Sequence, residues 1–590
     1  MDSKIMKNRS LFLIGMAFVI LSIFFSPGRI GTFIAENLSE DGILSDYFIY
    51  ALIFLRIVSL ITGLSCLVFL VLSRAFPEWI QACKKWLAGE KGAFWILIFI
   101  LILGGILRFH HLGEKSLWLD ETHTYVTVSH PHPGPLIASF RAPAAVMPPF
   151  YYLLLKASLV IFGKSEFSLR LVTCLAGIMS IAAVYKLTQK LWDRQMGLVA
   201  AFIMAVNVFH VSLSQIARRY ELSVLLAICS MLFFLYMLDR KSRIVWMLYP
   251  LTTILGLYTS HFFALVVLVQ IIYLLVTPIL IRLNWKRLII GYSLIAIICL
   301  PLFLIWVEWV ITGGESTGYR VGSPNWRSVI NLFKCFLVND ESGWGYQLFF
   351  PIALLGLYLG FLSRESSLCV TEGLKRKNGQ LMMLLWLVVP ISLCFILSRF
   401  FIQSFFMCRY FSIVSVPFYI FIAAGVISLS KRPFIIWLVW VIFAFNLFFV
   451  ILQYDPVKKE QWREAIAFLS EHSEKNDIIL AQIHEVTTGM DFIEHTHKTS
   501  PLDYYYSGQA EVIALPHNLE RQELAPYYRS IRNRLEQKKD FWLIIRKAFE
   551  RGQTSAFVLD LAGGNYQIVA EKKWPGVLLY RFEGVKNPER

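Results

Sequence analysis

The chain has 590 residues, of which 57% are hydrophobic and only 16% are charged. This composition excludes an ordinary soluble domain, because apolar runs of roughly 17–25 residues recur and each can cross about 30 Å of hydrocarbon. A net charge of +16 can indicate nucleic-acid binding, but here the basic residues form short clusters between apolar runs, where they direct membrane topology. We therefore expect a multi-pass membrane protein that binds membrane lipids and no nucleic acid.

The apolar runs are predicted to be helices, because backbone groups in lipid must hydrogen-bond within their own segment. The basic N-terminal segment and the stretch at 11–25 resemble a signal peptide, but no small-x-small cleavage site follows, so we interpret them as a retained anchor. About thirteen spans are expected, near residues 11–27, 47–73, 93–109, 168–190, 196–211, 220–238, 244–259, 262–281, 287–310, 346–362, 381–397, 409–429 and 434–452.

The basic clusters fall on alternate loops, which are predicted to face the cytoplasm. The N-terminus is then cytoplasmic. The long loops at 110–165 and 311–345, and everything after residue 454, face outward.

Residues 148–163 of the first outer loop are apolar but begin with Pro148 and Pro149 and contain Lys156. We predict an interfacial helix at the outer surface. The alternative is an additional span, which would invert every later loop.

The region from 454 is predicted to be a small α/β sandwich outside the cytoplasm. Helical spacing occurs at 462–476 and 519–539, and strand patterns occur at 477–483, 540–547 and 576–583. It contains no glycine-rich phosphate loop.

Nine cysteines are present, mostly within apolar runs. Only Cys335 and Cys408 are expected near the outer surface, and their positions do not indicate a bridge. Neither a disulfide framework nor a cysteine-based metal motif is predicted.

Two adjacent carboxylates, Asp120 and Glu121, lie in the otherwise apolar stretch "SLWLDETHTYV" (116–126). Close to the bilayer, neighbouring like charges resist double ionisation, so one carboxylate can act as an acid or base near neutrality. The alternative is that both merely solvate a helix end.

Arg218 and Arg219 lie in "SQIARRYELS" (214–223), at the predicted outer end of a helix where arginine is disfavoured. A guanidinium there needs an anionic partner, and a lipid phosphate is the obvious one. An ion pair with Glu221 or an ordinary headgroup contact is the alternative. Arg399 and Arg409 repeat the pattern at other outward helix ends.

Histidines are predicted to be external, and interfacial hydrogen-bonded histidines are favoured over a Zn²⁺ or Mn²⁺ site because no HExxH-like spacing occurs. Ionisable residues deep in the membrane look sparse, with Arg56 as the main candidate. The histidines outside the C-terminal region are His110, His111, His123, His130, His132, His210 and His261.

Residues 93–453 resemble the GT-C class of glycosyltransferases that use polyprenyl-phosphate sugars, which includes protein O-mannosyltransferases and bacterial transferases that modify lipid A and lipopolysaccharide core. The resemblance rests on five fragments in order: "R…LGEKSLWLDET", "PPFYYLLLKASLVIFGKSEFSLRLVTCLAG", "SQIARRYELSVLL", "YTSHFFALVVLVQ" and "CRYFSIVSVP". It departs from the family at Met147, where relatives often have a polar residue, and at Ile216, where they often have an acidic one.

The resemblance implies a mainly α, polytopic GT-C fold, with a two-span addition at 1–92, a catalytic region at 93–453 and an α/β domain at 454–590. It implies an inverting hexosyl- or pentosyltransferase of the inner membrane. The acceptor would be lipid A, core oligosaccharide, another lipid or a protein, and a flippase or transporter without glycosyl transfer is the alternative.

The resemblance also implies residue roles. Asp120 would deprotonate the acceptor and Glu121 would support it, and the double proline would form a surface helix beside the donor. The donor phosphate would contact Arg409 and Tyr410, and the charge argument above adds Arg218 and Arg219. Substrate or loop contacts would come from His123, Tyr220, Glu221, His261 and Arg399, and His123 and His261 are weak candidates for binding a divalent metal.

Overall fold

In the computed structural model, the described residues are 12–13, 15–23, 46–75, 78, 89–129, 148–238, 243–311, 323–338, 370–400, 406–429, 444, 446–454, 460–482, 501–515, 525–536, 538, 540–546, 558 and 566–584. The chain forms two compact units. The first contains Met1–His110, Leu171–Leu304 and Val321–Asp455, and the second contains His111–Arg170, Ile305–Arg320 and Pro456–Arg590. The predicted first outer loop therefore belongs to the same unit as the C-terminal region. The boundaries at 92 and 453 stay a prediction.

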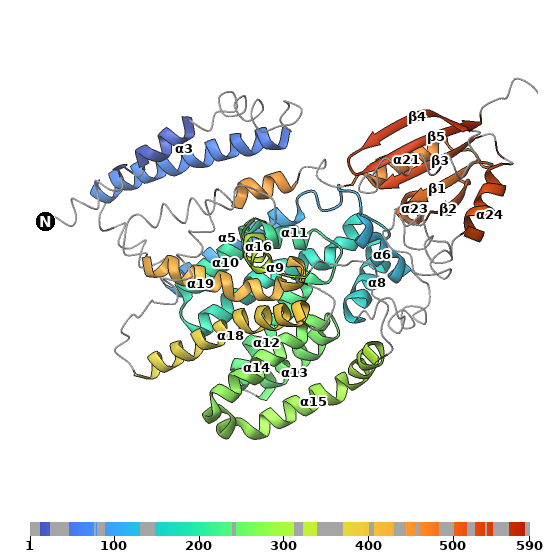
Figure 1. Cartoon of the computed structure of the whole chain (residues 1–590). Coiled ribbons are helices and arrows are strands. Elements are labelled where there is room, and N and C mark those ends of the chain that lie inside the picture. The colour runs from blue at the N-terminus through green and yellow to red at the C-terminus, as the bar shows by residue number, and fades with distance from the viewer. Residues whose placement is uncertain are drawn as a thin grey trace, which may run out of the picture. The chain divides into compact units, whose positions relative to one another are not determined.

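The first unit is helical in its described residues (Figure 1). Helix α12, for example, is apolar on all sides and largely buried against neighbours such as α13, as expected of a helix inside a bundle. The elements are α3 (Asp46–Ala75), α5 (Glu90–Phe109), most of α9 (Glu166–Leu191), α10 (Arg194–Val206), α11 (Val208–Ser214), α12 (Tyr220–Leu238), α13 (Arg243–Leu257), η1 (His261–Phe263), α14 (Ala264–Val276), most of α15 (Pro278–Ile311), α16 (Trp326–Val338), α18 (Val370–Phe400), η2 (Cys408–Val414) and α19 (Ser415–Leu429).

Six helices among the described residues are long and apolar enough to cross a membrane, and a seventh results if α10 and α11, which meet at a bend of 60°, form one broken span. The chain is therefore a multi-pass membrane protein. The predicted total of thirteen spans is not confirmed, and the span predicted at 346–362 lies outside the described residues. The six are Glu90–Phe109, Glu166–Leu191, Tyr220–Leu238, Trp285–Glu308, Gly379–Phe400 and Cys408–Ile427.

The predicted interfacial segment forms helix α8 (Phe150–Phe162), in the second unit. The helix begins directly after Pro149, and it ends at Gly163, whose φ of 78° suits glycine at a helix C-terminus. Its 13 residues are too few to span a bilayer. Its place at the membrane surface stays a prediction.

The C-terminal part of the second unit is an α/β sandwich, as predicted. Its five strands lie in the order β2-β1-β3-β5-β4, with β1 parallel to both neighbours and β3, β5 and β4 antiparallel. The elements are α21 (Trp462–His472), β1 (Ile478–Gln482), α23 (Pro501–Tyr505), β2 (Glu511–Ala514), α24 (Ala525–Leu535), β3 (Asp540–Arg546), β4 (Tyr566–Trp574) and β5 (Val577–Gly584).

Alternation along the central strands builds two cores, because successive side chains of a strand point to opposite faces. Ile478 and Leu480 of β1 pack with Ile531 and Leu535 of α24 on one face. On the other face, Ile479 packs against residues of α21 and α23. Figure 1 shows the sheet with the helices α21, α23 and α24 labelled beside it.

One expectation about the cysteines is wrong. Cys335 of α16 and Cys408 of η2 form a disulfide across 73 residues, with their Cα atoms 6.4 Å apart. Helix α16 lies within the predicted outer loop at 311–345, so the bridge ties this loop to the "CRYFS" stretch. Sequence spacing did not reveal the pair because only chain packing brings the two cysteines together.

Candidate active site

The acidic couplet lies in the first turn of a short helix, α6 (Leu119–Ser129), in the second unit. The carbonyl of Trp118 accepts the backbone N–H groups of Glu121 at 2.9 Å and Thr122 at 3.1 Å. In return, the Trp118 backbone N–H donates to the Glu121 carboxylate at 3.4 Å. Negative charge is favourable at this position, because the first turn of a helix has free N–H groups and the positive end of the dipole.

Glu121 is fully buried and forms a two-point ion pair with Arg170. The Arg170 Nε and Nη2 atoms donate to its two carboxylate oxygens at 2.9 and 2.8 Å, and both side chains are at most 1% exposed. The same guanidinium also donates at 2.9–3.1 Å to the backbone carbonyls of Leu112, Lys115 and Ser116. Buried ion pairs are tolerated only when such additional bonds satisfy the charged groups. Glu121 and Arg170 together thus fix the loop that precedes α6.

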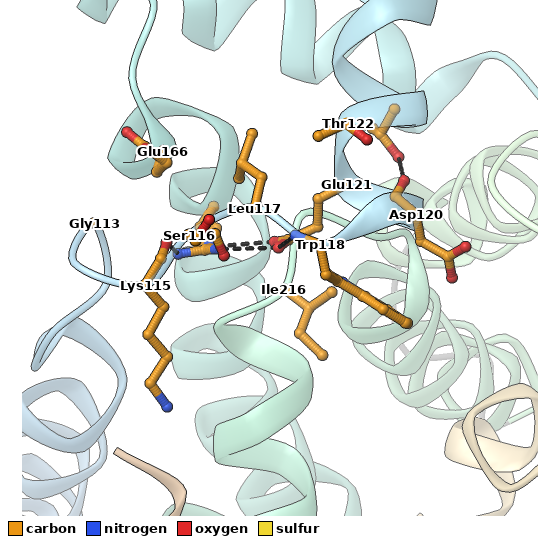
Figure 2. A network of polar contacts seen from close by, with 12 residues as sticks. Gly113, Lys115, Ser116, Leu117, Trp118, Asp120, Glu121, Thr122, Glu166 and Ile216 are labelled. Carbon is orange, nitrogen blue, oxygen red and sulfur yellow. Dashed lines mark hydrogen bonds and ion pairs between the residues drawn. The ribbon is translucent and has the colours of Figure 1, made fainter. Parts of the chain in front are cut away.

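Asp120 lies on a different side of the helix. Figure 2 shows its carboxylate pointing away from the dashed contacts made by Glu121, and the residue is half-buried. His123 lies one turn further along the same side, with its Nδ1 atom 3.3 Å from the Thr127 hydroxyl. The sequence led us to expect repulsion between two uncompensated carboxylates. In the structure Glu121 is compensated, because Arg170 supplies its counter-charge.

In the helical unit, three arginines lie in two segments that pack together at Tyr220 and Tyr410. Arg218 and Arg219 directly precede α12, and Arg409 lies beside Tyr410 in η2. The guanidinium carbon of Arg409 is 5.9 Å from the centre of the Tyr410 ring. Tyr220, the residue after Arg219, has its ring centre 6.2 Å from that of Tyr410.

Aromatic surface and polar donors occur together in this Tyr410 cluster. Phe262 stacks on Tyr410 with ring centres 5.1 Å apart. The Arg219 Nε and the Tyr220 hydroxyl are buried and have no hydrogen-bond partner within the described part of the chain. Because buried donors normally find an acceptor, and a guanidinium binds anionic oxygens best, the cluster has the chemistry of an anion site.

A buried bridge couples the two segments that contain the arginines. The His210 Nδ1 atom is 3.0 and 3.2 Å from the two Glu221 oxygens, and its Nε2 atom is 2.9 Å from the Ser415 hydroxyl. All three side chains are completely buried. Glu221 follows Arg219 by two residues and Ser415 opens α19 directly after η2, so the bridge holds the two segments in a fixed relation. The Glu221 side chain therefore faces the interior of the helical bundle.

The turn that contains Arg218 is anchored by further hydrogen bonds. The Gln215 amide donates to the carbonyls of Arg108 at 3.2 Å and His110 at 2.7 Å, and the Thr173 hydroxyl donates to the carbonyl of Ile216 at 3.0 Å. Ile216 thus contributes to the site through its backbone.

Arg108, in the helical unit, is fully buried, as Arg170 is in the second unit. It donates to the Ser214 hydroxyl at 3.1 Å and to three backbone carbonyls at 2.9–3.1 Å. Gly177 permits this approach, since a Cβ there would collide with the Ser214 oxygen and lie 2.9 Å from the Arg108 Nε. Arg108 and Glu221 are buried at the ends of their helices, whereas Arg56, the residue expected deep in the membrane, is exposed on α3.

Three further residues, Arg399, His261 and His123, were predicted to contact substrate or to bind a metal. Arg399 is exposed in the last turn of α18, and no hydrogen bond or ion pair among the described residues joins it to the Tyr410 cluster. His261 opens η1, next to Phe262. The described residues contain no group of three or more His, Cys, Asp or Glu side chains arranged for a metal ion, and His123 and His261 belong to different units.

The acidic couplet and the Tyr410 cluster also belong to different units, with Asp120 in the second and Arg218 in the first. Their convergence on one substrate stays a prediction.

Several buried residues escaped the sequence analysis, among them Arg108, Arg170 and the bridge formed by His210. A signal for the arginines was present, because both lie at apolar helix segments ("LILGGILRF" and "EFSLRLVTC"), where a charged residue is costly and marks a site. Nothing in the sequence marked His210 as the partner of Glu221 and Ser415.

Comparison with known proteins extends these observations. Residues 146–309 match a family model described as dolichyl-phosphate-mannose-protein mannosyltransferase. No curated protein matches the chain in sequence.

Two crystal structures of ArnT from Cupriavidus metallidurans resemble the structure. The apo form has a TM-score of 0.53 at 13% identity, covering 82% of this chain and 97% of ArnT. The form bound to undecaprenyl phosphate has a TM-score of 0.54 at 13% identity, covering 84% of this chain and 98% of ArnT. The matched segment and the shared architecture confirm the predicted resemblance: the chain has the fold of the polytopic GT-C glycosyltransferases.

Proposed function

We propose that this protein transfers a sugar from a polyprenyl-phosphate donor to an envelope acceptor at the outer face of the membrane. The observation that carries this proposal is the Tyr410 cluster of the membrane-embedded unit. In it Arg409 lies 5.9 Å from the Tyr410 ring, and Arg218 and Arg219 directly precede Tyr220, whose ring lies 6.2 Å from that of Tyr410. Three cations beside stacked aromatic rings suit a phosphate that is attached to an apolar chain.

The cluster would bind the donor phosphate and stabilise the leaving group. Arg219 and Tyr220 each have a buried donor atom that remains to be satisfied among the described residues, and a phosphate oxygen satisfies such donors. Preorganised positive charge at the point where negative charge develops is often the largest contribution to catalysis.

Asp120 would act as the general base on the acceptor. The acceptor oxygen forms a bond to the anomeric carbon, the bond from that carbon to the phosphate oxygen breaks, and its electron pair leaves with polyprenyl phosphate. The acceptor proton passes to the Asp120 carboxylate. General-base assistance of this kind is worth about 10²–10⁴-fold, and a single displacement inverts the anomeric configuration.

Glu121 would support the base without contacting the substrate, because its carboxylate is buried and occupied by Arg170. Its role would be to keep the first turn of α6 in place, so that Asp120 is held in one position.

Support also comes from the comparisons, since the matching family model describes a dolichyl-phosphate-mannose-protein mannosyltransferase and one similar structure is bound to undecaprenyl phosphate. We propose a hexosyl- or pentosyltransferase of the inner membrane, with lipid A, core oligosaccharide, another lipid or a protein as the acceptor. The predicted inner-membrane location and the outward orientation of the C-terminal region belong to this proposal.

A lipid-linked-saccharide flippase is the second candidate, and the buried ionisable residues of the helical unit favour it, since transporters often use such groups. Arg108 and Glu221, however, are bonded to fixed groups of the bundle, which suits a rigid site better than a moving one.

The deciding experiment uses the full-length protein in liposomes with a synthetic polyprenyl-phosphate sugar and an extract of envelope acceptors. Release of free polyprenyl phosphate together with a glycosylated product supports transfer. Movement of the intact lipid-linked sugar across the bilayer without release supports the flippase.

The base is tested by Asp120→Asn, which should reduce transfer by at least about 10²-fold while donor binding persists. Glu114→Gln is the matched control, because Glu114 is an exposed acid of the same loop that pairs with His111. Asp120 is not the base if Asp120→Asn retains the activity of Glu114→Gln.

A further inference from the structure

The loop that leads into the acidic couplet is held by the C-terminal domain as well as by Arg170. Arg463 of α21 donates to the carbonyls of Glu114 at 2.9 Å and Gly113 at 3.3 Å, and more weakly to that of Lys115 at 3.5 Å. Its backbone N–H donates to the Ser116 hydroxyl at 3.0 Å. All of these residues belong to the second unit.

The same guanidinium is itself held by a carboxylate at the start of α9. Arg463 Nε and Nη2 donate to one oxygen of Glu166 at 3.0 and 2.5 Å. Arg463 is about one-third exposed and Glu166 is 15% exposed, so the pair is partly shielded from water. Arg170 lies one helical turn after Glu166 on α9. Two guanidinium groups, those of Arg170 and Arg463, therefore bind the same loop, and both donate to the carbonyl of Lys115.

A tyrosine of the C-terminal domain also binds this loop. The Tyr505 hydroxyl of α23 donates to Glu166 at 3.0 Å and accepts the backbone N–H of Leu117 at 2.7 Å. Burial raises the pKa of Tyr505 above its ordinary value, so the hydroxyl stays protonated and can donate. Leu119, the first residue of α6, packs against the core formed by α21 and the sheet.

A second contact lies along α6 itself. The rings of Tyr125 on α6 and Tyr504 on α23 meet edge to face at 4.7 Å. The Lys164 ammonium lies 4.9 Å from the first ring centre and 4.5 Å from the second, and it donates to the Tyr504 carbonyl at 3.2 Å. The C-terminal domain therefore contacts α6 at its first residue and again one turn after the couplet.

We propose that the C-terminal domain is a working part of the active site, in which Arg463 and Tyr505 are positioning residues that clamp the segment Gly113–Leu119 and thereby fix where Asp120 lies. The clamp acts through backbone carbonyls and one backbone N–H, so it sets the path of the chain into α6 whatever the side chains of the loop are. This inference rests on the proposed function and deepens it, since the general base requires a defined position.

The physical reason is the cost of misplacement. A shift of about 1 Å in a catalytic group can lower turnover about 10²-fold. A loop without regular secondary structure has many competing conformations, and fixing the backbone of each residue costs about 1–2 kcal/mol of conformational entropy. The hydrogen bonds from the two guanidinium groups stabilise one of these conformations.

The test compares three full-length variants by hydrogen exchange of the backbone amides and by turnover of a polyprenyl-phosphate sugar. Arg463→Ala removes the guanidinium, and Tyr505→Phe removes only the hydroxyl that bonds Leu117 and Glu166. Arg534→Ala is the matched control, because it removes an exposed arginine of the same domain that pairs with Glu511.

In Arg463→Ala, amides in residues 113–122 should exchange at least about tenfold faster than in Arg534→Ala. Turnover should fall by about 10²-fold, while the KM for the donor changes less than about twofold, because the clamp contacts none of the residues proposed to bind the donor phosphate. Tyr505→Phe should accelerate exchange chiefly at Leu117 and should lower kcat in the same sense. A merely structural role would lower the amount of folded protein and leave kcat per folded molecule unchanged.

Unchanged exchange in residues 113–122 of folded Arg463→Ala or Tyr505→Phe overturns the clamp. Faster exchange with wild-type kcat overturns its role in positioning Asp120. If Arg463→Ala does not fold, Tyr505→Phe decides both points. Should the wild-type protein transfer no sugar at all, the proposed function fails, and the exchange experiment still tests the clamp on its own.

Discussion

The buried pair of Glu121 and Arg170 makes a sharp quantitative prediction. Both side chains are at most 1% exposed, and the pair has two direct N–H···O bonds of 2.9 and 2.8 Å. Replacing Glu121 by glutamine keeps the side-chain volume and one acceptor oxygen but leaves the Arg170 charge without a counter-charge. Breaking a buried pair in this way costs about 3–5 kcal/mol. We therefore expect Glu121→Gln to lower the free energy of unfolding by about 3 kcal/mol, because the loop carbonyls still accept three of the guanidinium bonds.

The assay is a urea titration of the detergent-solubilised protein, read by pulse proteolysis with cleavage sites monitored in the second unit. A double-mutant cycle with Arg170→Gln isolates the interaction: the double variant should be more stable than the sum of the single losses predicts, by at least about 1 kcal/mol. Glu511→Gln is the control, since the Glu511–Arg534 pair is about half exposed on both sides and exposed pairs contribute about 0–1 kcal/mol.

The reasoning is refuted if Glu121→Gln is as stable as Glu511→Gln, or if the cycle shows no coupling between positions 121 and 170. Either result would mean that water or another group compensates Arg170, and that the first turn of α6 is held by something else.

Three further predictions concern the helical unit. Arg219→Ala should weaken binding of polyprenyl phosphate by more than about tenfold, because a hydrogen bond to a charged group is worth about 1.5–3 kcal/mol; equal affinity in a direct binding measurement would remove Arg219 from the phosphate site. His210→Gln should disconnect the Glu221–Ser415 bridge and raise the KM for the donor without changing that for the acceptor, and an unchanged donor KM contradicts a positioning role. Cys335→Ser should lower stability by about 4 kcal/mol, the value for a cross-link that closes a loop of this length; alkylation of both thiols in the unreduced wild-type protein would show that the bridge does not form.

Local sequence patterns were sufficient to predict the type of several helices and strands. Apolar runs such as "YELSVLLAICSMLFFLYML" predicted a membrane helix at α12, because lipid leaves the backbone no other way to satisfy its hydrogen bonds. Prolines at one end and glycine at the other bounded α8, and short apolar runs marked β1 and β3. In each case the interactions that determine the secondary structure lie within a few residues of one another, so the spacing of residues along the chain predicts it.

Local patterns were not sufficient for the partners within the site. Position 121 was recognised as important from its neighbours, but its counter-charge lies 49 residues away. The cysteine bridge spans 73 residues, and the histidine at 210 meets the serine at 415 across 205 residues.

The sequence by itself therefore determined that the chain is a mainly helical membrane protein with a small sheet after residue 454. Only the tertiary structure decided which buried charge meets which counter-charge. The physical reason is that a buried ionic group is stable only with a partner, and the identity of that partner depends on how distant helices pack.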